Sequence, residues 1–153
     1  MEIRNPNYRA ATAAIFGAAP FIGELGIEAV TIAPGRVETR LAVTARHQQQ
    51  DGFIHAGVQA TLADHTAGAA AFTVIGADQL VLTSTFTINL LAAARGEELW
   101  ARAEVIKAGR RLVVAEASVY VRQAAAEQLV ARALVTLAVL PRPTKNSEDH
   151  PQG

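Results

Sequence analysis

The stretch from Ile54 to Phe72 constrains the fold more than any other part of the chain, and it reads IHAGVQATLADHTAGAAAF. Most of these residues are good helix formers, and the Asp51-Gly52 break before them marks a helix start, so the stretch predicts one helix. Alanine and glycine fall on nearly every face of that helix, which leaves no continuous polar face to meet water. A helix that is apolar all round is expected to be buried. We therefore expect the rest of the fold to cover it.

Two ionisable residues, Asp64 and His65, lie in the middle of this helix. Buried carboxylates are rare unless they are paired or functional. His65 points about 100° away from Asp64 round the helix, so we expect it to be structural and to lie outside any site that Asp64 forms. The residues three, four or seven positions from Asp64 are all small, which leaves space above its carboxylate for a ligand or a second chain: Gly57, Ala60, Thr61, Ala67, Gly68 and Ala71. The alternative is tight packing of the helix on a sheet, with Asp64 capping a neighbouring loop.

The composition narrows the class of protein. Of the 153 residues 50% are apolar and 18% are charged, which is typical of one globular domain. The 14 basic and 14 acidic side chains balance and form no basic run, which argues against nucleic acid or an anionic membrane surface as a partner. The absence of cysteine excludes disulfides, thiolate metal sites and a cysteine nucleophile. The four histidines have no spacing at which metal ligands converge, so we expect no metal site.

The two ends of the chain are simpler to interpret. The apolar stretch from Ala10 to Ile22 is too short and too interrupted by Gly and Pro to span a bilayer, and it lacks the features of a signal peptide. We therefore expect a cytoplasmic protein. Residues 141–153 show no periodicity and predict a flexible tail, which leaves residues 1–140 as a single domain.

The remaining periodicity predicts one more helix and a sheet. Asn5-Pro6 opens a helix over residues 7–17, which Pro20 ends. In the segment 81–91, strict alternation places Thr83 and Thr85 on the face opposite Ser84 and Phe86. Short links between consecutive strands favour antiparallel pairing, so we expect an α+β fold in which an antiparallel sheet wraps around the central helix. The strands are expected at 26–32, 36–44, 81–91, 98–106, 112–122 and 129–140.

This order of elements resembles that of the hotdog-fold acyl-CoA thioesterases, in the phenylacetate-degradation (PaaI-like) branch. The family commonly has His-Gly-Gly at the start of the helix and Leu-Ala-Asp further along, and here these positions read His55-Ala56-Gly57 and Leu62-Ala63-Asp64. The family often has Asn six residues before the histidine, where this chain has Gln49. The later segments TSTFTINLLAAARG and GRRLVVAEASV are also similar to a strand and a hairpin of the family.

The resemblance implies hydrolysis of the thioester of a small, medium-chain or aromatic acyl-CoA, with no cofactor because coenzyme A is part of the substrate. We assign Asp64 as the general base on water or as the direct nucleophile, and these two remain open. The backbone N–H groups of Ala56 and Gly57 are assigned as donors to the carbonyl oxygen of the substrate. His55 either orients the loop before the helix or contacts the thioester, and Gln49 takes the place of the family's Asn.

Further residues and partners follow from the same resemblance. The family implies a Ser or Thr that holds the attacking water, and Thr83 is our first choice, with Ser84 and Thr85 as the neighbouring alternatives. Arg110 and Arg111 form either a solvated hairpin tip or a contact with the phosphates of coenzyme A. The family's site lies at a dimer interface, and its dimers commonly pair into tetramers. The competing interpretation is a non-catalytic hotdog domain that binds acyl-CoA or a partner protein.

Overall fold

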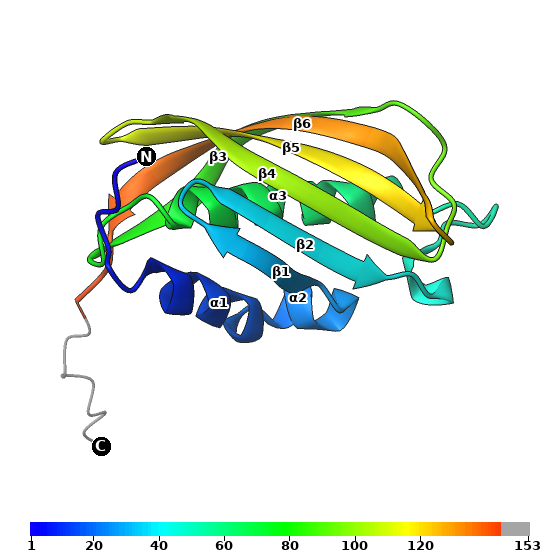
Figure 1. Ribbon diagram of the computed structural model, residues 1–153, viewed down its shortest axis with the longest axis horizontal. Coiled ribbons are helices and arrows are strands. Elements are labelled where there is room, and N and C mark those ends of the chain that lie inside the picture. The colour runs from blue at the N-terminus through cyan, green and yellow to red at the C-terminus, as the bar shows by residue number, and fades with distance from the viewer. Residues whose placement is uncertain (145–153) are drawn as a thin grey trace, which may run out of the picture.

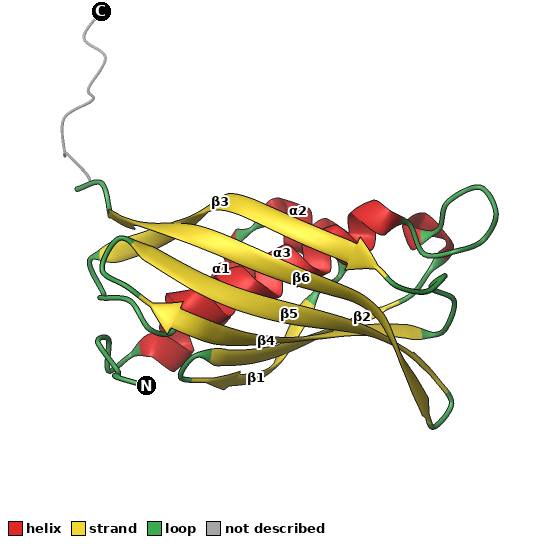
Figure 2. Ribbon diagram, turned by 90° about the horizontal axis from the view of Figure 1, so that it is seen from above, coloured by secondary structure: helices red, strands yellow, loops and turns green. Residues whose placement is uncertain are grey.

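The computed structural model describes residues 1–144, which form a six-stranded antiparallel sheet curved around one long helix (Figures 1 and 2). The order of strands in the sheet is β1-β2-β4-β5-β6-β3. The helices are α1 (Tyr8–Ala18), α2 (Pro20–Leu25) and α3 (Ala56–Phe72), with a 3₁₀ turn, η1, at Ala45–His47. The strands are β1 (Glu28–Ala33), β2 (Arg36–Ala42), β3 (Gln79–Leu90), β4 (Glu98–Ala108), β5 (Leu112–Gln123) and β6 (Ala126–Pro141). The predicted α+β architecture is confirmed.

Helix α3 is buried because its small side chains let the sheet approach closely. Ala63, Ala67 and Ala70 are inaccessible to solvent, and they face strand residues such as Leu99 and Val119 that are equally buried. Burial of this much apolar surface supplies the main stabilisation of such a fold. None of the described helices is both long and apolar enough to cross a membrane.

Pro20 begins a second helix as well as following the first, which the sequence analysis did not anticipate. Helix α1 ends at Ala18, and α2 starts at Pro20, where the missing N–H of proline costs no hydrogen bond. Gly26 closes α2 with a φ of +77°, a left-handed conformation that glycine adopts without strain.

The end of the sheet also differs from the prediction. Strand β6 includes Pro141, and the backbone N–H of Arg142 donates to the carbonyl oxygen of Asp78 at 2.8 Å. These two residues were expected in the flexible tail, but they are bound to the sheet. Residues 145–153 of the predicted tail lie outside the described residues.

Strand β3 contains a β-bulge that corrects the predicted faces of this strand. Thr83 lies opposite the buried Leu137, and Phe86 lies opposite the buried Val135, with a register shift between Thr83 and Thr85. Residues that pair directly across a ladder point to the same face. Thr83 therefore shares the helix-facing side of the sheet with Phe86, whereas strict alternation had placed the two on opposite faces. A bulge adds one residue to a strand, and hydrophobic alternation does not reveal it.

Candidate active site

Asp64 and Thr83 meet in a cavity between α1, α3, β3 and the end of β6. The hydroxyl of Thr83 donates to Oδ1 of Asp64 at 2.7 Å. The cavity has a volume of about 420 Å³, and its floor along α3 is small and apolar where Gly68 and Ala69 lie. Thr83 faces the helix because it pairs with Leu137, which is buried on the helix-facing side of the sheet. Asp64 is thus a half-buried carboxylate that lines a cavity, and the hydroxyl of Thr83 binds one of its two oxygens.

His65 lines the same cavity, which corrects the expectation that it lies outside any site formed by Asp64. Its ring lies edge-on to Phe16 of α1, with the ring centroids 4.7 Å apart. Burial lowers the pKa of His65, although the charge of Asp64 acts in the opposite direction. The Nε2 atom is buried and has no hydrogen-bond partner among residues 1–144. Burial therefore favours the neutral form of the His65 imidazole, whose buried Nε2 is unsatisfied within residues 1–144.

His55 caps the start of α3. Its Nδ1 accepts a hydrogen bond from the N–H of Gly57 at 2.8 Å, so this donor is occupied in the structure. The N–H of Ala56, the first helical residue, has no acceptor within residues 1–144. Of the two amides that the sequence analysis assigned, Ala56 therefore presents the unoccupied donor at the positive end of the helix.

A buried histidine that the sequence analysis left without a role fixes this helix start. The Nδ1 of His47 accepts from the N–H of Thr44 at 2.9 Å, and its Nε2 lies 2.8 Å from the carbonyl oxygen of Leu25. The carbonyl oxygen of His47 then accepts from the N–H of His55 at 2.8 Å. The loop before α3 is thereby attached to α2, which holds the Ala56 amide in place.

The two halves of the predicted site lie apart within one copy of the chain. Gly57 precedes Asp64 by seven residues, or about 10 Å along an α-helix. The helix-start amides therefore do not reach a group that lies on the carboxylate of the same copy. A single chain holds the carboxylate and the amide donors in two separate places.

Two comparisons with known proteins decide the family. The model of the thioesterase superfamily matches residues 51–127, which contain α3, Asp64 and Thr83. The 1,4-dihydroxy-2-naphthoyl-CoA hydrolase of Listeria monocytogenes is 34% identical over 92 residues, which cover 60% of this chain and 75% of that protein. The chain belongs to the thioesterase superfamily. It is a thioester hydrolase.

Solved structures support the same assignment of this thioesterase. A thioesterase family protein from Silicibacter pomeroyi has a TM-score of 0.86 and 37% identity, over 88% of this chain and 99% of that chain. The PaaI protein of E. coli, from the phenylacetic acid degradation operon, shares the fold with a TM-score of 0.79 at 19% identity, over 91% of this chain and 96% of that chain. The predicted resemblance to the hotdog-fold thioesterases is confirmed.

Gln49 of the thioesterase lies away from Asp64, at the start of α3. Its Oε1 accepts from the N–H groups of Asp51 and Phe53, so its amide shapes the loop before the helix. Together with Ala56 it lines a separate hollow that continues along the residues after β3.

Gln59 lines the same hollow, is only 4% exposed, and was not among the residues predicted from the sequence. Its Nε2 donates to the carbonyl oxygen of Ile54 at 3.2 Å, while its Oε1 has no partner among residues 1–144. The available signal was a lone amide in an apolar run, one helical turn after Ala56 and Gly57.

The remaining candidates do not meet Asp64 in the structure. Ser84 is the extra residue of the bulge, and Thr85 lies opposite Thr136 on the other face of the sheet. Arg110 and Arg111 line a hollow at the turn between β4 and β5, apart from the Asp64 cavity. Residues 1–144 contain no group of three His, Asp or Glu side chains that could hold a metal ion.

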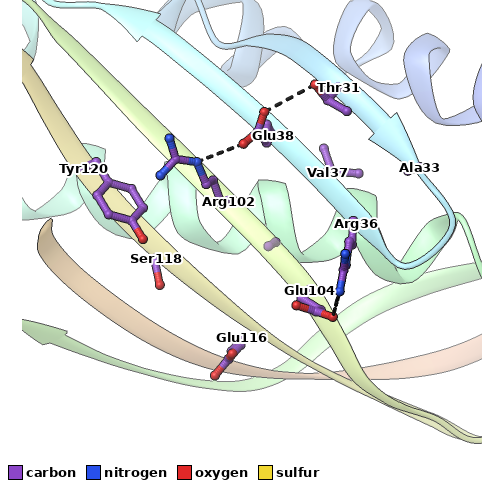
Figure 3. Close-up of a pocket in the computed structure, with 11 residues that line it drawn as sticks. Thr31, Ala33, Arg36, Val37, Glu38, Arg102, Glu104, Glu116, Ser118 and Tyr120 are labelled. Atoms are coloured by element: carbon purple, nitrogen blue, oxygen red, sulfur yellow. Dashed lines mark hydrogen bonds and ion pairs between the residues drawn. The ribbon is translucent and has the colours of Figure 1, made fainter. Parts of the chain in front are cut away.

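A second hollow of about 410 Å³ lies on the outer face of the sheet, away from α3 (Figure 3). Its charged side chains are largely paired: Arg102 Nε donates to Glu38 at 2.9 Å, and Arg36 Nη2 donates to Glu104 at 2.6 Å. Arg102 also lies over the ring of Tyr120, with its guanidinium carbon 4.5 Å from the ring centroid. These ion pairs, which form an outer lattice, satisfy most of the charges of the hollow, and the hydroxyl of Thr31 also donates to Glu38, at 3.3 Å. Both carboxylate oxygens of Glu38 are therefore occupied within the hollow.

Proposed function

We propose that this thioesterase hydrolyses acyl-CoA esters with a small, medium-chain or aromatic acyl group, and that Asp64 is its catalytic carboxylate. The hydrogen bond between Thr83 and Asp64 at the wall of the cavity is the observation that carries the proposal. The named activity of the Listeria relative supports an aromatic acyl group, because the substrate in its name, 1,4-dihydroxy-2-naphthoyl-CoA, is an aromatic acyl-CoA.

Asp64 acts in one of two ways in this proposal. As a general base it accepts a proton from water while the water oxygen attacks the thioester carbon, and the coenzyme A thiolate then leaves. As a nucleophile its oxygen attacks the same carbon, and water cleaves the resulting anhydride in a second step. Thr83 holds Oδ1 of Asp64, which leaves Oδ2 to face the water or the carbon. His55 acts as an orienting residue, which its bond to Gly57 supports.

The developing charge on the carbonyl oxygen requires a fixed donor. The N–H of Ala56 fits this role because it has no acceptor within residues 1–144 and lies at the positive end of α3. One such donor is typically worth roughly 3–4 kcal/mol of transition-state stabilisation. Gly57 becomes a second donor only when the His55 ring releases its N–H.

The proposed site combines two copies of the chain, because one copy separates the two halves by about 10 Å. Two α3 helices that run antiparallel across a twofold axis near Ala60 place Ala56 of each copy beside Asp64 of the other. Strand β3 supports this arrangement, since it is an edge strand with Leu82 (57%) and Leu90 (49%) strongly exposed. Pairing of such dimers into tetramers remains a prediction, and so does contact of Arg110 and Arg111 with coenzyme A phosphates.

The decisive experiment compares wild type with Asp64→Asn on a panel of short-chain, long-chain, phenylacetyl and benzoyl esters of coenzyme A. We expect kcat to fall ~100-fold or more, the range for loss of a general base or nucleophile. Glu38→Gln, which removes a carboxylate from the outer lattice, is the matched control and should keep full activity. If Asp64→Asn hydrolysed the esters as fast as wild type, Asp64 would have no part in the mechanism. No wild-type turnover on any ester would favour the binding domain.

A mixing experiment tests the two-copy site. Ala56→Pro removes the proposed donor and leaves the helix start intact, because proline is tolerated at the first helical position and His55 already has an extended ψ of 138°. Each of Ala56→Pro and Asp64→Asn should be nearly inactive alone. Unfolding and refolding the two together should restore about a quarter of the wild-type activity, because half of the dimers carry one complete site. No recovery, with dimers reformed, would contradict a shared site.

A further inference from the structure

Arg142 lies at the end of the Asp64 cavity that is farther from the carboxylate. Its Nε donates to the carbonyl oxygen of Gln79 at 3.0 Å, and its guanidinium carbon is 5.4 Å from the centroid of the Phe72 ring. Its backbone N–H is bound to Asp78. The side chain is therefore held in one place at the edge of the cavity, with its two Nη groups making no hydrogen bond to residues 1–144.

The cavity runs the length of two elements between Asp64 and Arg142. On the helix, Phe72 follows Asp64 by eight residues, or about 12 Å. On the strand, Gln79 precedes Thr83 by four residues, or about 13 Å. Thr83 binds Asp64 at one end, and Gln79 binds Arg142 at the other. The wall between the two ends is apolar, from Gly68 and Ala69 to Leu80 and Leu137.

The charge of Arg142 lacks a carboxylate partner in the part of the chain that is described. Two arginines of the outer face, by contrast, pair with acidic residues: Arg36 with Glu104 and Arg102 with Glu127. An unpaired guanidinium at the end of an apolar cavity favours an oxygen acceptor, and a carboxylate most of all, because both Nη groups can donate to it.

We propose that Arg142 determines acyl specificity by binding an oxygen at the far end of the acyl group. The proposal rests on the assignment of the Asp64 cavity to the substrate. With the thioester carbon at Asp64, a ring or a chain of about six carbons extends along the apolar wall, and a terminal carboxylate or hydroxyl reaches the Nη groups. Arg142 is exposed in the free enzyme, so an acyl group that ends in hydrogen covers the guanidinium without offering it an acceptor, which costs binding.

The test measures kcat/KM of the full-length enzyme on two matched pairs of substrates. Adipyl-CoA and hexanoyl-CoA differ only in the terminal carboxylate, and 4-hydroxyphenylacetyl-CoA and phenylacetyl-CoA differ only in the hydroxyl. We expect wild type to prefer the oxygenated member by ~10-fold or more, the range for hydrogen bonds to charged groups. Arg142→Met should remove this preference by slowing only the oxygenated members. Arg142→Lys should keep part of it for adipyl-CoA.

Arg132→Met is the matched control, since Arg132 lies on β6, the strand that Arg142 follows, and alternates with Ala131 and Ala133, which face the core. It should leave both preferences unchanged. A uniform loss across all four substrates in Arg142→Met would show a contact with coenzyme A or a purely structural clamp, and would overturn the proposal. So would the absence of any preference in wild type.

A binding measurement separates this proposal from the proposed function. In the Asp64→Asn background, calorimetric dissociation constants for the same four esters report on acyl recognition without turnover. An Arg142-dependent preference in binding, together with an inactive wild type, would support Arg142 and reject the hydrolysis of these esters. An active wild type whose binding ignores Arg142 would reject only the present inference.

Discussion

Two hollows of similar volume, about 410 and 420 Å³, lie on opposite faces of the same sheet. In the outer hollow, Arg102 donates to Glu38 and to Glu127, and its hydrogen bond to Glu127 raises the pKa of Arg102. In the inner cavity, one hydroxyl holds Asp64, and the Nε2 of His65 has no partner within residues 1–144.

The difference between the two hollows separates charged side chains that stabilise the fold from those that are available to a substrate. Charges that already have partners stabilise the sheet and have little capacity left for a ligand. Polar atoms that remain unsatisfied carry a desolvation cost, which a substrate is well placed to relieve. The size of a hollow does not separate the two cases, whereas the state of its polar atoms does.

Of the three changes that compare the two hollows, removing the hydroxyl beside Asp64 should have the largest effect. Thr83→Val keeps the shape of the side chain but loses the bond to the carboxylate, and we expect kcat to fall ~10-fold, or about 1.4 kcal/mol. Thr85→Val, two positions along on the outer face, is the control and should retain the wild-type rate. Steady-state kinetics on the best ester of the panel provides the measurement. Equal losses in both variants would mean that the hydrogen bond from Thr83 to Asp64 does not support the reaction.

A smaller effect, on stability alone, is expected in the outer lattice. Glu127 accepts from Arg102 and from Arg122, and the hydrogen bond from Arg102 is the main cause that lowers its pKa below the ordinary value of 4.5. Glu127→Gln should reduce the free energy of unfolding at pH 7 by about 1 kcal/mol and leave kcat unchanged.

The pH dependence of the unfolding free energy tests whether the charge of Glu127 causes the loss of stability in Glu127→Gln. A lowered carboxyl pKa stabilises the folded state above pH 4.5, and this contribution disappears as the pH falls through the folded-state pKa. Urea unfolding of wild type and Glu127→Gln should therefore converge at acidic pH. A difference that persists there would point to packing rather than charge.

The smallest effect concerns His65. Burial lowers its pKa from 6.5, so the unfolded chain binds a proton more readily than the folded one. The stability of wild type should thus decline as the pH falls below 6.5, until the folded-state pKa is passed. His65→Gln should remove this part of the decline, by a few tenths of a kcal/mol in urea unfolding series. The same slope in both proteins would show that His65 does not titrate differently in the two states.

Local pattern was enough to predict much of this molecule. The all-small run around Asp64 predicted a buried helix, and the short links between strands predicted antiparallel pairing, because both signals depend on residues close in the chain. Asp64 could be identified as a candidate site residue because a carboxylate is unusual in a helix that is otherwise small, apolar and expected to be buried.

Contacts between residues far apart in the chain could not be predicted from local sequence patterns. The orientation of Thr83 toward Asp64 depends on its pairing with Leu137, more than fifty residues away, and the bulge that follows Thr83 depends on the same ladder. The place of Arg142 depends on where β6 ends beside Gln79, and without that contact it resembled part of a polar tail. His65 reaches the cavity because α1 covers that side of α3 and Phe16 meets its ring, which no spacing within α3 reveals.

The extra residue in β3 has a consequence for how such chains diverge. Ser84 has no partner on β6, whereas Thr83 and Thr85 pair with the neighbouring residues Leu137 and Thr136. A chain that lost Ser84 would keep every other pair in the ladder, so natural selection on the fold alone would scarcely register the deletion. Yet every residue after it would shift by one position in number. An alignment of the two chains that is fixed on the residues after the bulge and has no gap would then match Thr83 with a residue whose side chain lies on the opposite face of the sheet.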